Sequence, residues 1–237
     1  MHSFKVLVIT MLVMVLLVPM ALAEEVSASK LSVQLNPQLD YLVLVNNDNP
    51  YEFGGEYDTA LTEKNENGEY VAMSYVPDTG GEPTLVEKAT FMAFTQLQAN
   101  LAQRGMLVQL LSGYRTKDDQ DWLVNYYKEN PVSWSVAEAG KSEHHTGLVL
   151  SVQIWYRGDD GKYLWFTETE ERQEAIPFFA LLHEVMPDYG FIDRFPAGKE
   201  VWTGYGSEPF EIRFVGSAEV AHEIMDNGLC LEEYLNK

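Results

Sequence analysis

The stretch MLVQLLSGYRT, residues 106–116, decides how this chain folds. Its first six residues are apolar apart from Gln109, a pattern that predicts a buried β-strand. The SGYRT that follows is a polar turn. A helix is predicted after this turn, and it carries Trp122, Leu123, Tyr126 and Tyr127. We therefore expect polar groups to gather at the mouth of a buried strand.

Helices and strands are expected on both sides of this stretch. Upstream, apolar residues from Phe91 to Leu101 recur at spacings of three and four, and Gly105 stands where a left-handed C-cap is expected. Strands are predicted over 40–45, 70–75, 148–156, 163–166 and 212–215, and further helices around 178–185 and 218–225. Two hairpin-like returns favour an α+β fold: a single domain with a central, mostly antiparallel sheet flanked by helices.

Composition excludes several classes of function. The chain has 237 residues, of which 46% are apolar, so it can bury a core of its own. Its 16 Lys and Arg against 36 Asp and Glu give a net charge of −20, which would repel a phosphate backbone, so nucleic acid is not expected as a partner. Cys230 is the one cysteine, which excludes disulfides within the chain and any multi-cysteine metal site.

The first 23 residues predict export. An uncharged run from Val6 to Ala23 follows Lys5 and ends in Ala-Leu-Ala, as a cleavable signal peptide does. An uncleaved N-terminal anchor is the alternative, since the run is close to the shortest length that spans a bilayer. We expect residues 24–237 to lie at a bacterial cell surface, in a periplasm or outside the cell, with membrane contact only through an uncleaved N-terminal segment.

Three polar clusters are candidates for chemistry. In the first, Arg115 after the buried strand can grip a carboxylate with two hydrogen bonds, and Gln120 follows it. The second is SEHHTG, residues 142–147; its adjacent histidines point in different directions, so at most one readily faces a metal. The third is EPFEIR, residues 208–213, in which Glu211 and Arg213 share one strand face if the last strand extends back to Glu211.

In this order and spacing, the clusters resemble the zinc D-alanyl-D-alanine carboxypeptidases of the vancomycin-resistance type, which trim peptidoglycan stem peptides. The resemblance covers about residues 41–235 and implies a hedgehog/D,D-peptidase-like fold. It is carried by LVLVNNDNP (42–50, with the strand and turn), SGYRT with Gln120, SEHHTGL, YGF with RFP (189–196), TGY before EP, and the ending GLCLEEYL.

The resemblance also implies a site. In such enzymes two histidines and an aspartate hold zinc, and a glutamate activates water. His144 keeps the first histidine position, but Ser151 stands where the aspartate is expected and Glu211 stands in place of the second histidine. Glu208 keeps the position of the catalytic base. The retained positions that bind substrate are Arg115 and Ser142, which would hold the terminal carboxylate and neighbouring peptide groups, with Gln120 supporting them.

We interpret the chain as a degenerate member that binds stem peptides ending in D-alanine without cleaving them, and we expect no cofactor. One alternative is an active metal-dependent D,D-carboxypeptidase, with zinc held by His144, Glu211 and either His145 or Glu208. A second is a non-catalytic surface interaction domain, which the acidic surface and the aromatic residues Trp155, Tyr156, Tyr163 and Trp165 motivate.

Overall fold

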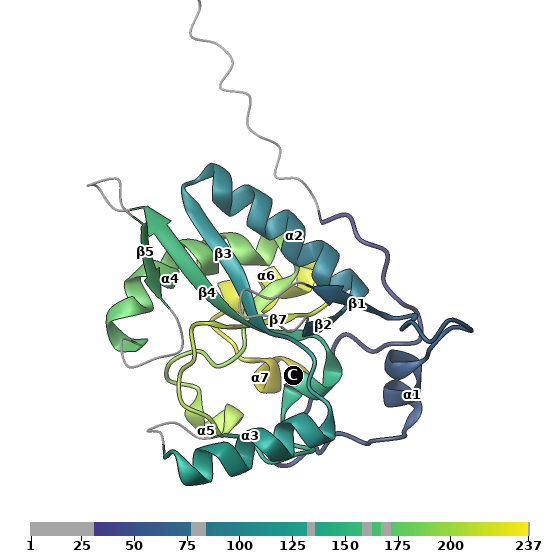
Figure 1. Ribbon diagram of the computed structural model, residues 1–237. Helices are drawn as coiled ribbons and strands as arrows, with labels where there is room; N and C mark the ends of the chain where they lie inside the picture. Colours follow the sequence, from purple (N-terminus) through teal and green to yellow (C-terminus); the bar gives the residue numbers. More distant parts are fainter. Residues whose placement is uncertain (1–30, 77–83, 132–135, 158–162, 167–171, 237) are drawn as a thin grey trace, which may run out of the picture.

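A five-stranded antiparallel sheet forms the centre of the computed structural model (Figure 1), which describes residues 31–76, 84–131, 136–157, 163–166 and 172–236, and the side chains of this set outside 156–178. Its strands are β3 (Met106–Ser112), β4 (Val149–Arg157), β5 (Tyr163–Phe166), β6 (Phe191–Asp193) and β7 (Glu211–Phe214). The order β3-β4-β7-β6, with β5 also paired to β4, confirms the predicted α+β architecture.

The strand β4 is the axis of the sheet. Along one edge it pairs with β3, and along the other it pairs first with β7 and then with β5. The register sets Ser151 opposite Glu211 on β7 and opposite Ser112 on β3. Because successive strand residues alternate in direction, Leu150 faces the apolar core and Ser151 faces away from it.

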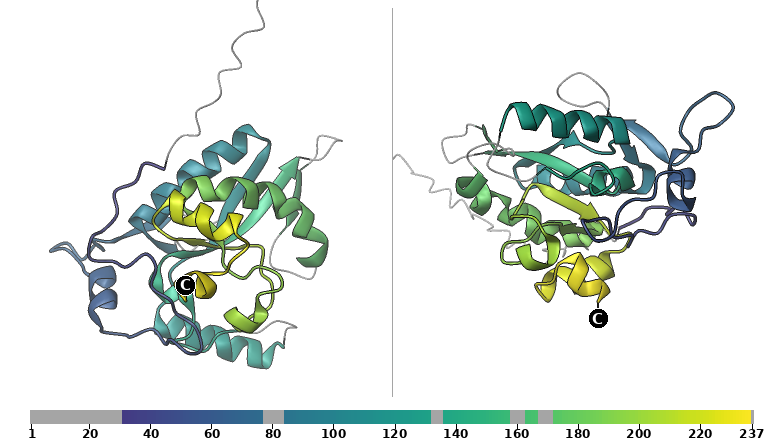
Figure 2. Two further views of the ribbon diagram at one scale, coloured as in Figure 1. Left: turned by 180° about the vertical axis from the view of Figure 1, so that it is seen from behind. Right: turned by 90° about the horizontal axis from the view of Figure 1, so that it is seen from below.

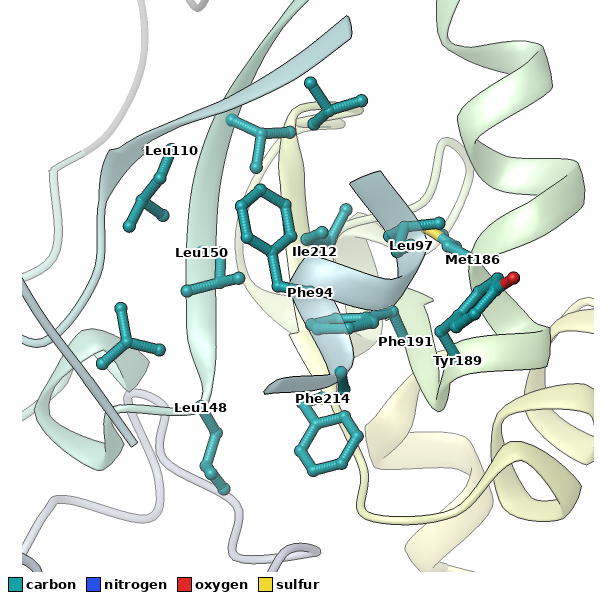
Figure 3. Packing of buried hydrophobic residues seen from close by; sticks show 14 of the residues in the cluster. Phe94, Leu97, Leu110, Leu148, Leu150, Met186, Tyr189, Phe191, Ile212 and Phe214 are labelled. Carbon is teal, nitrogen blue, oxygen red and sulfur yellow. The ribbon is translucent and has the colours of Figure 1, made fainter. Parts of the chain in front are cut away.

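The apolar core lies between the sheet and the helix α2 (Lys88–Gln103) (Figure 3). Phe94 and Leu97 of α2 pack there with Leu150 and Ile212 of the sheet. Glu87 caps the helix by accepting hydrogen bonds from the backbone N–H of residues 89 and 90. Gly105 has a φ of 83°, as the expected left-handed C-cap requires.

The remaining elements surround this framework. The helices α4 (Arg172–Val185) and α6 (Ala218–Asp226) lie toward the viewer when the molecule is seen from behind (Figure 2), and α4 packs into the same apolar core as α2. The helix α3 (Lys117–Glu129) lies toward the end of β3 where the polar turn begins (Figure 1). The short elements are α1 (Glu56–Thr62), β1 (Met73–Val76), β2 (Thr84–Glu87), the 3-10 turns η1 (Glu143–Thr146) and η2 (Met186–Tyr189), α5 (Glu200–Thr203) and α7 (Leu231–Leu235).

The strand predicted over 40–45 is wrong. This segment is irregular, because side chains rather than a neighbouring strand satisfy its backbone. Arg213 donates to the carbonyl oxygens of Tyr41 and Val43, and the carboxylate of Asp40 accepts from the N–H of Leu42. The strand predicted over 70–75 is shifted and appears as β1, which pairs with β2.

The predicted signal peptide or anchor, residues 1–23, lies outside the described residues. Among the helices that the structure describes, none is both long and apolar enough to cross a membrane.

Candidate functional site

One cavity of about 420 Å³ brings the three predicted polar clusters together. It lies at the sheet face opposite the apolar core, between the sheet and α3. All seven predicted site residues line it: Arg115, Gln120, Ser142, His144, Ser151, Glu208 and Glu211. Sequence positions separated by nearly a hundred residues therefore face one space.

Three hydrogen bonds join the SGYR segment to η1. His144 Nδ1 donates to Gly113 O at 2.6 Å, the backbone N–H of Arg115 donates to His144 O at 3.1 Å, and His145 Nδ1 donates to Arg115 O at 2.7 Å. Carbonyl oxygens only accept, so the first and third bonds place a proton on each Nδ1. The two segments that carry Arg115 and His144 are thus held as one unit.

Gly113 is required where the SGYR segment passes β2. A Cβ there would lie 2.5 Å from the carbonyl oxygen of Leu85 and 2.8 Å from Cγ2 of Val86. The short distance between the two segments allows a backbone hydrogen bond, in which the N–H of Tyr114 donates to Leu85 O at 2.7 Å. Any side chain at position 113 would push the segment away from its partner strand.

The guanidinium of Arg115 is oriented from two sides. Its Nε donates to Ser112 Oγ at 3.1 Å, and one terminal nitrogen donates to Gln120 Oε1 at 3.0 Å. Gln120 is fully buried and donates in turn to Ala137 O at 2.7 Å. Gln120 therefore holds the Arg115 guanidinium in place, which leaves a preorganised cation at the cavity wall.

His144, Ser151 and Glu211 meet directly at the cavity floor. Ser151 Oγ donates to Glu211 Oε1 at 2.6 Å and lies 3.4 Å from His144 Nε2. Glu211 Oε2 lies 3.4 Å from the same nitrogen. All three residues are at most 5% exposed. The three positions that would hold zinc in the resembled enzymes therefore contact one another.

Charge and burial compete at Glu211. Burial alone would raise the pKa of its carboxyl, but His144, then Arg115 and the hydrogen bond from Ser151, outweigh burial and hold that pKa below the ordinary value. The carboxyl is therefore ionised at neutral pH. Within the described part of the chain, its Oε2 accepts no hydrogen bond of good geometry, and it lies 3.4 Å from His144 Nε2.

His145 cannot serve as the metal ligand that the rebuilt-site alternative considered. Both of its ring nitrogens bind backbone: Nδ1 donates to Arg115 O, and Nε2 accepts from the N–H of Gly140 at 3.0 Å. The side chain is fully buried, and burial, as the largest of several effects, lowers its pKa and favours the neutral ring that this bonding requires. His145 instead ties Arg115 to the turn at Gly140.

Ser142 and Glu208 complete the predicted set. Ser142 precedes η1 and is 5% exposed at the cavity wall. Glu208 lies in the loop before β7, where its N–H donates to Phe195 O and its carbonyl oxygen accepts from the N–H of Glu211. These backbone bonds hold Glu208 close to Glu211 at the cavity floor.

Sequence reasoning missed the apolar wall of the cavity. Leu111 at the end of β3 and Leu123 and Tyr127 of α3 line it, and Trp122 reaches from it toward solvent with 64% exposure. Helical spacing identified the α3 residues as a helix face, and the position of α3 directly after SGYRT was the available signal that this face borders the site. This wall places an apolar surface beside Arg115.

The aromatic residues that motivated the interaction-domain alternative lie on β4 and β5, and the structure describes the side chain of one of them. Trp155 is half-buried, and its Nε1 donates to Gln109 Oε1 at 2.7 Å, which makes it part of the β3–β4 pair. The side chains of Tyr156, Tyr163 and Trp165 lie outside the described set.

The donor set does not fit the zinc site that the resemblance implies. A hydroxyl stays protonated at neutral pH and is a weak zinc ligand, and the proton of Ser151 is already committed to Glu211. One imidazole and one carboxylate remain, fewer than the three protein ligands typical of catalytic zinc. Across the described residues, no group of three or more His, Cys, Asp or Glu side chains is arranged to hold a metal ion.

Comparison with known proteins extends over most of the chain. Residues 83–217 match the family model described as VanY, D-alanyl-D-alanine carboxypeptidase. A D-alanyl-D-alanine carboxypeptidase of Enterococcus faecalis is 32% identical over 211 residues, which cover 82% of this chain and 65% of that relative. The chain thus spans slightly less than two thirds of the relative's length.

Two solved structures share the fold. The vancomycin-resistance D,D-pentapeptidase VanY of a VanB-type cassette, in complex with Zn(II), aligns with a TM-score of 0.58 and 28% identity over 83% of this chain and 99% of the other. VanYB in complex with D-alanine-D-alanine aligns with a TM-score of 0.58 and 27% identity, covering 83% of this chain and 98% of the other. The predicted family and fold are confirmed.

Proposed function

Because this chain belongs to the VanY family of D-alanyl-D-alanine carboxypeptidases, we propose that it binds peptides that end in D-alanine, such as peptidoglycan stem peptides, without hydrolysing them. It would do so in the bacterial cell envelope, to which the apolar segment of residues 6–23 would direct it. The structure of VanYB in complex with D-alanine-D-alanine supports this class of ligand.

The binding half of the proposal rests on Arg115. Its guanidinium is held by Ser112 and Gln120 and borders the cavity, so its orientation is largely fixed before a ligand arrives. A terminal carboxylate would accept hydrogen bonds from it, and Ser142 lies on the same cavity wall to meet a neighbouring peptide group. The apolar wall of α3 would receive the side chains farther along the peptide.

The loss of hydrolysis rests on one observation: Ser151 Oγ donates to Glu211 Oε1 at 2.6 Å, with His144 Nε2 3.4 Å away. The three ligand positions contact one another and supply only one imidazole and one carboxylate. We propose that the substitutions at 151 and 211 removed the catalytic zinc site, and that Glu208 persists without a metal-activated water to deprotonate.

A second candidate is an active enzyme with a rebuilt metal site. The observation in its favour is Glu211 Oε2, which accepts no hydrogen bond of good geometry in the described part of the chain and faces His144 Nε2 at 3.4 Å. A cation between these two atoms would satisfy both, although recruiting Glu208 as a third ligand would remove the base.

The deciding experiment titrates the purified full-length protein with an acyl-D-Ala-D-Ala peptide by calorimetry, while mass spectrometry follows release of D-alanine with and without added zinc. The matched acyl-L-Ala-L-Ala peptide is the control ligand. We expect heat of binding for the D,D-peptide alone and no D-alanine. Absence of binding would overturn the proposal. Release of D-alanine that stops with a chelator and in Glu208→Gln would establish the second candidate.

A further inference from the structure

A buried cluster of four charged side chains lies directly behind the cavity. Arg194 and Arg213 are fully buried, and Glu143 and Glu232 are at most 5% exposed. Arg194 Nε donates to Glu143 Oε2 at 2.6 Å, and its two terminal nitrogens bind the two oxygens of Glu232 at 3.0 and 2.7 Å. Arg213 lies 3.0 Å from Glu143 Oε1. The charges of the cluster sum to zero.

The cluster unites parts of the chain that are far apart in sequence. Glu143 belongs to η1, Arg194 follows β6, Arg213 lies on β7, and Glu232 lies in the first turn of the C-terminal helix α7. Asn46 also donates to Glu232, at 3.3 Å. Two segments that carry the family resemblance, RFP (194–196) and LEEYL (231–235), have no role in the site described above. They contribute Arg194 and Glu232 to the cluster.

Glu143 connects the cluster to the site. It stands between Ser142 and His144, which both line the cavity, and the three share the start of one short 3-10 turn. His144 and His145 tie one side of the turn to the SGYR segment, and the buried side chain of Glu143 ties the other side to Arg194 and Arg213. A shift of Glu143 would be passed to the residues on both sides of it.

We propose that Glu232 is a positioning residue for the cavity: it orients Arg194, which orients Glu143 and thereby sets the positions of Ser142 and His144. The bidentate contact from Glu232 fixes the plane of the Arg194 guanidinium, and that plane determines where Nε points. The helix α7 then influences the binding site indirectly, through Arg194 and Glu143. The expected effect of Glu232 on peptide affinity rests on the proposed function, whereas its expected effect on the orientation of His144 does not.

Fold stability alone is a weaker explanation of this cluster. Well-packed apolar residues stabilise a core as well as or better than buried ion pairs do, because the pairs must first lose their hydration. What an apolar replacement lacks is direction: it would fill the volume of Arg194 and Glu232 without holding Glu143 at a fixed angle. Stability and positioning are therefore separable by substitution.

The test compares Glu232→Gln with Glu233→Gln in the full-length protein. Glu233 is the matched control because it lies on the same helix, and its carboxylate binds outside the cluster, to Lys199 at 2.7 Å and to the N–H of Cys230 at 3.0 Å. The readouts are the imidazole NMR signals of His144, the affinity for an acyl-D-Ala-D-Ala peptide, and the melting temperature. We expect Glu232→Gln to shift the His144 signals and to weaken peptide binding about tenfold. Glu233→Gln should do neither.

The double variant Arg194→Met/Glu232→Leu separates positioning from stability, and it remains informative if Glu232→Gln does not fold. We expect its melting temperature to be near that of the parent, with His144 signals and peptide affinity still altered. Parental His144 signals in folded Glu232→Gln, or in the double variant, would overturn the inference. If the parent protein binds no peptide, the proposed function fails, and the His144 signals still decide whether Glu232 positions the turn.

Discussion

Ser151 donates a 2.6 Å hydrogen bond to Glu211 across the β4–β7 pair. The register of the two strands makes these residues direct neighbours, so a substitution at either position changes the hydrogen bonding of the other. The resemblance described above implies a zinc ligand at each of these two positions. Here the pair forms a closed contact that needs no metal to satisfy the serine proton.

The guanidinium of Arg115 should carry most of the recognition of a terminal carboxylate. We expect Arg115→Ala to weaken binding of an acyl-D-Ala-D-Ala peptide by about 10- to 100-fold, the loss typical of a charge-assisted hydrogen bond. Calorimetry measures the change. Arg104→Ala is the control, since the ion pair of Arg104 with Glu184 at 3.5 Å is exposed and Arg104 does not line the cavity. Equal affinity in Arg115→Ala and the parent would favour the interaction-domain alternative.

The close approach at Gly113 should make this position intolerant of a side chain. In Gly113→Ala, the added Cβ meets Leu85 O at 2.5 Å, so the SGYR segment must move away from β2. We expect a loss of about 1–3 kcal/mol in the free energy of unfolding, together with weaker peptide binding. Gly206→Ala is the control, because a Cβ there meets nothing within 4 Å. Denaturant unfolding that shows the same stability for both variants would refute the required contact.

Acid should destabilise the fold through Glu143. Burial alone would raise the pKa of Glu143, but Arg194 and Arg213 outweigh it and hold this pKa below its ordinary value. A carboxylate with a depressed folded-state pKa adds stability above the unfolded value of about 4.3, and this stability is lost as the pH falls through the folded-state pKa. We expect Glu143→Gln to cost about 3–5 kcal/mol at neutral pH, because it leaves buried cations undercompensated.

The measurement for Glu143 is the free energy of unfolding as a function of pH. The parent should lose stability steeply below about pH 4.3, and Glu143→Gln should follow a flatter curve over that range. Asp121→Asn is the control, since its pair with Lys117 is exposed and contributes little. Parallel curves for the parent and Glu143→Gln would show that the acid loss arises elsewhere.

Local patterns were sufficient to predict most of the sheet and its main helices. Helix α2 follows from apolar spacing between Phe91 and Leu101, because a buried helix face repeats within a few residues. The irregular segment at 40–45 could not be predicted in this way. Its short apolar run is typical of a strand, but Arg213, some 170 residues away, donates hydrogen bonds to two of its carbonyl groups. Only the folded chain shows that competition.

The membership of the site was predictable, but its contacts were not. The family resemblance implied that Arg115, His144 and Glu208 belong to one site, and the structure places all three at one cavity. That Ser151 would bond Glu211 depends on strand register, and the occupation of both ring nitrogens of His145 depends on how two loops meet. The buried cluster around Arg194 likewise requires four segments to converge, which no single stretch of sequence encodes.

Zinc binding tests the loss of the metal site most directly. Calorimetry and elemental analysis should show no stoichiometric zinc in the parent protein purified without chelator, whereas Ser151→Asp/Glu211→His, which rebuilds the family's ligand set beside His144, should bind one zinc ion and release D-alanine from an acyl-D-Ala-D-Ala peptide. His144→Ala in that background should abolish both. Stoichiometric zinc in the parent, lost on Glu211→Gln, would contradict the proposal and make Glu211 a ligand of an active site.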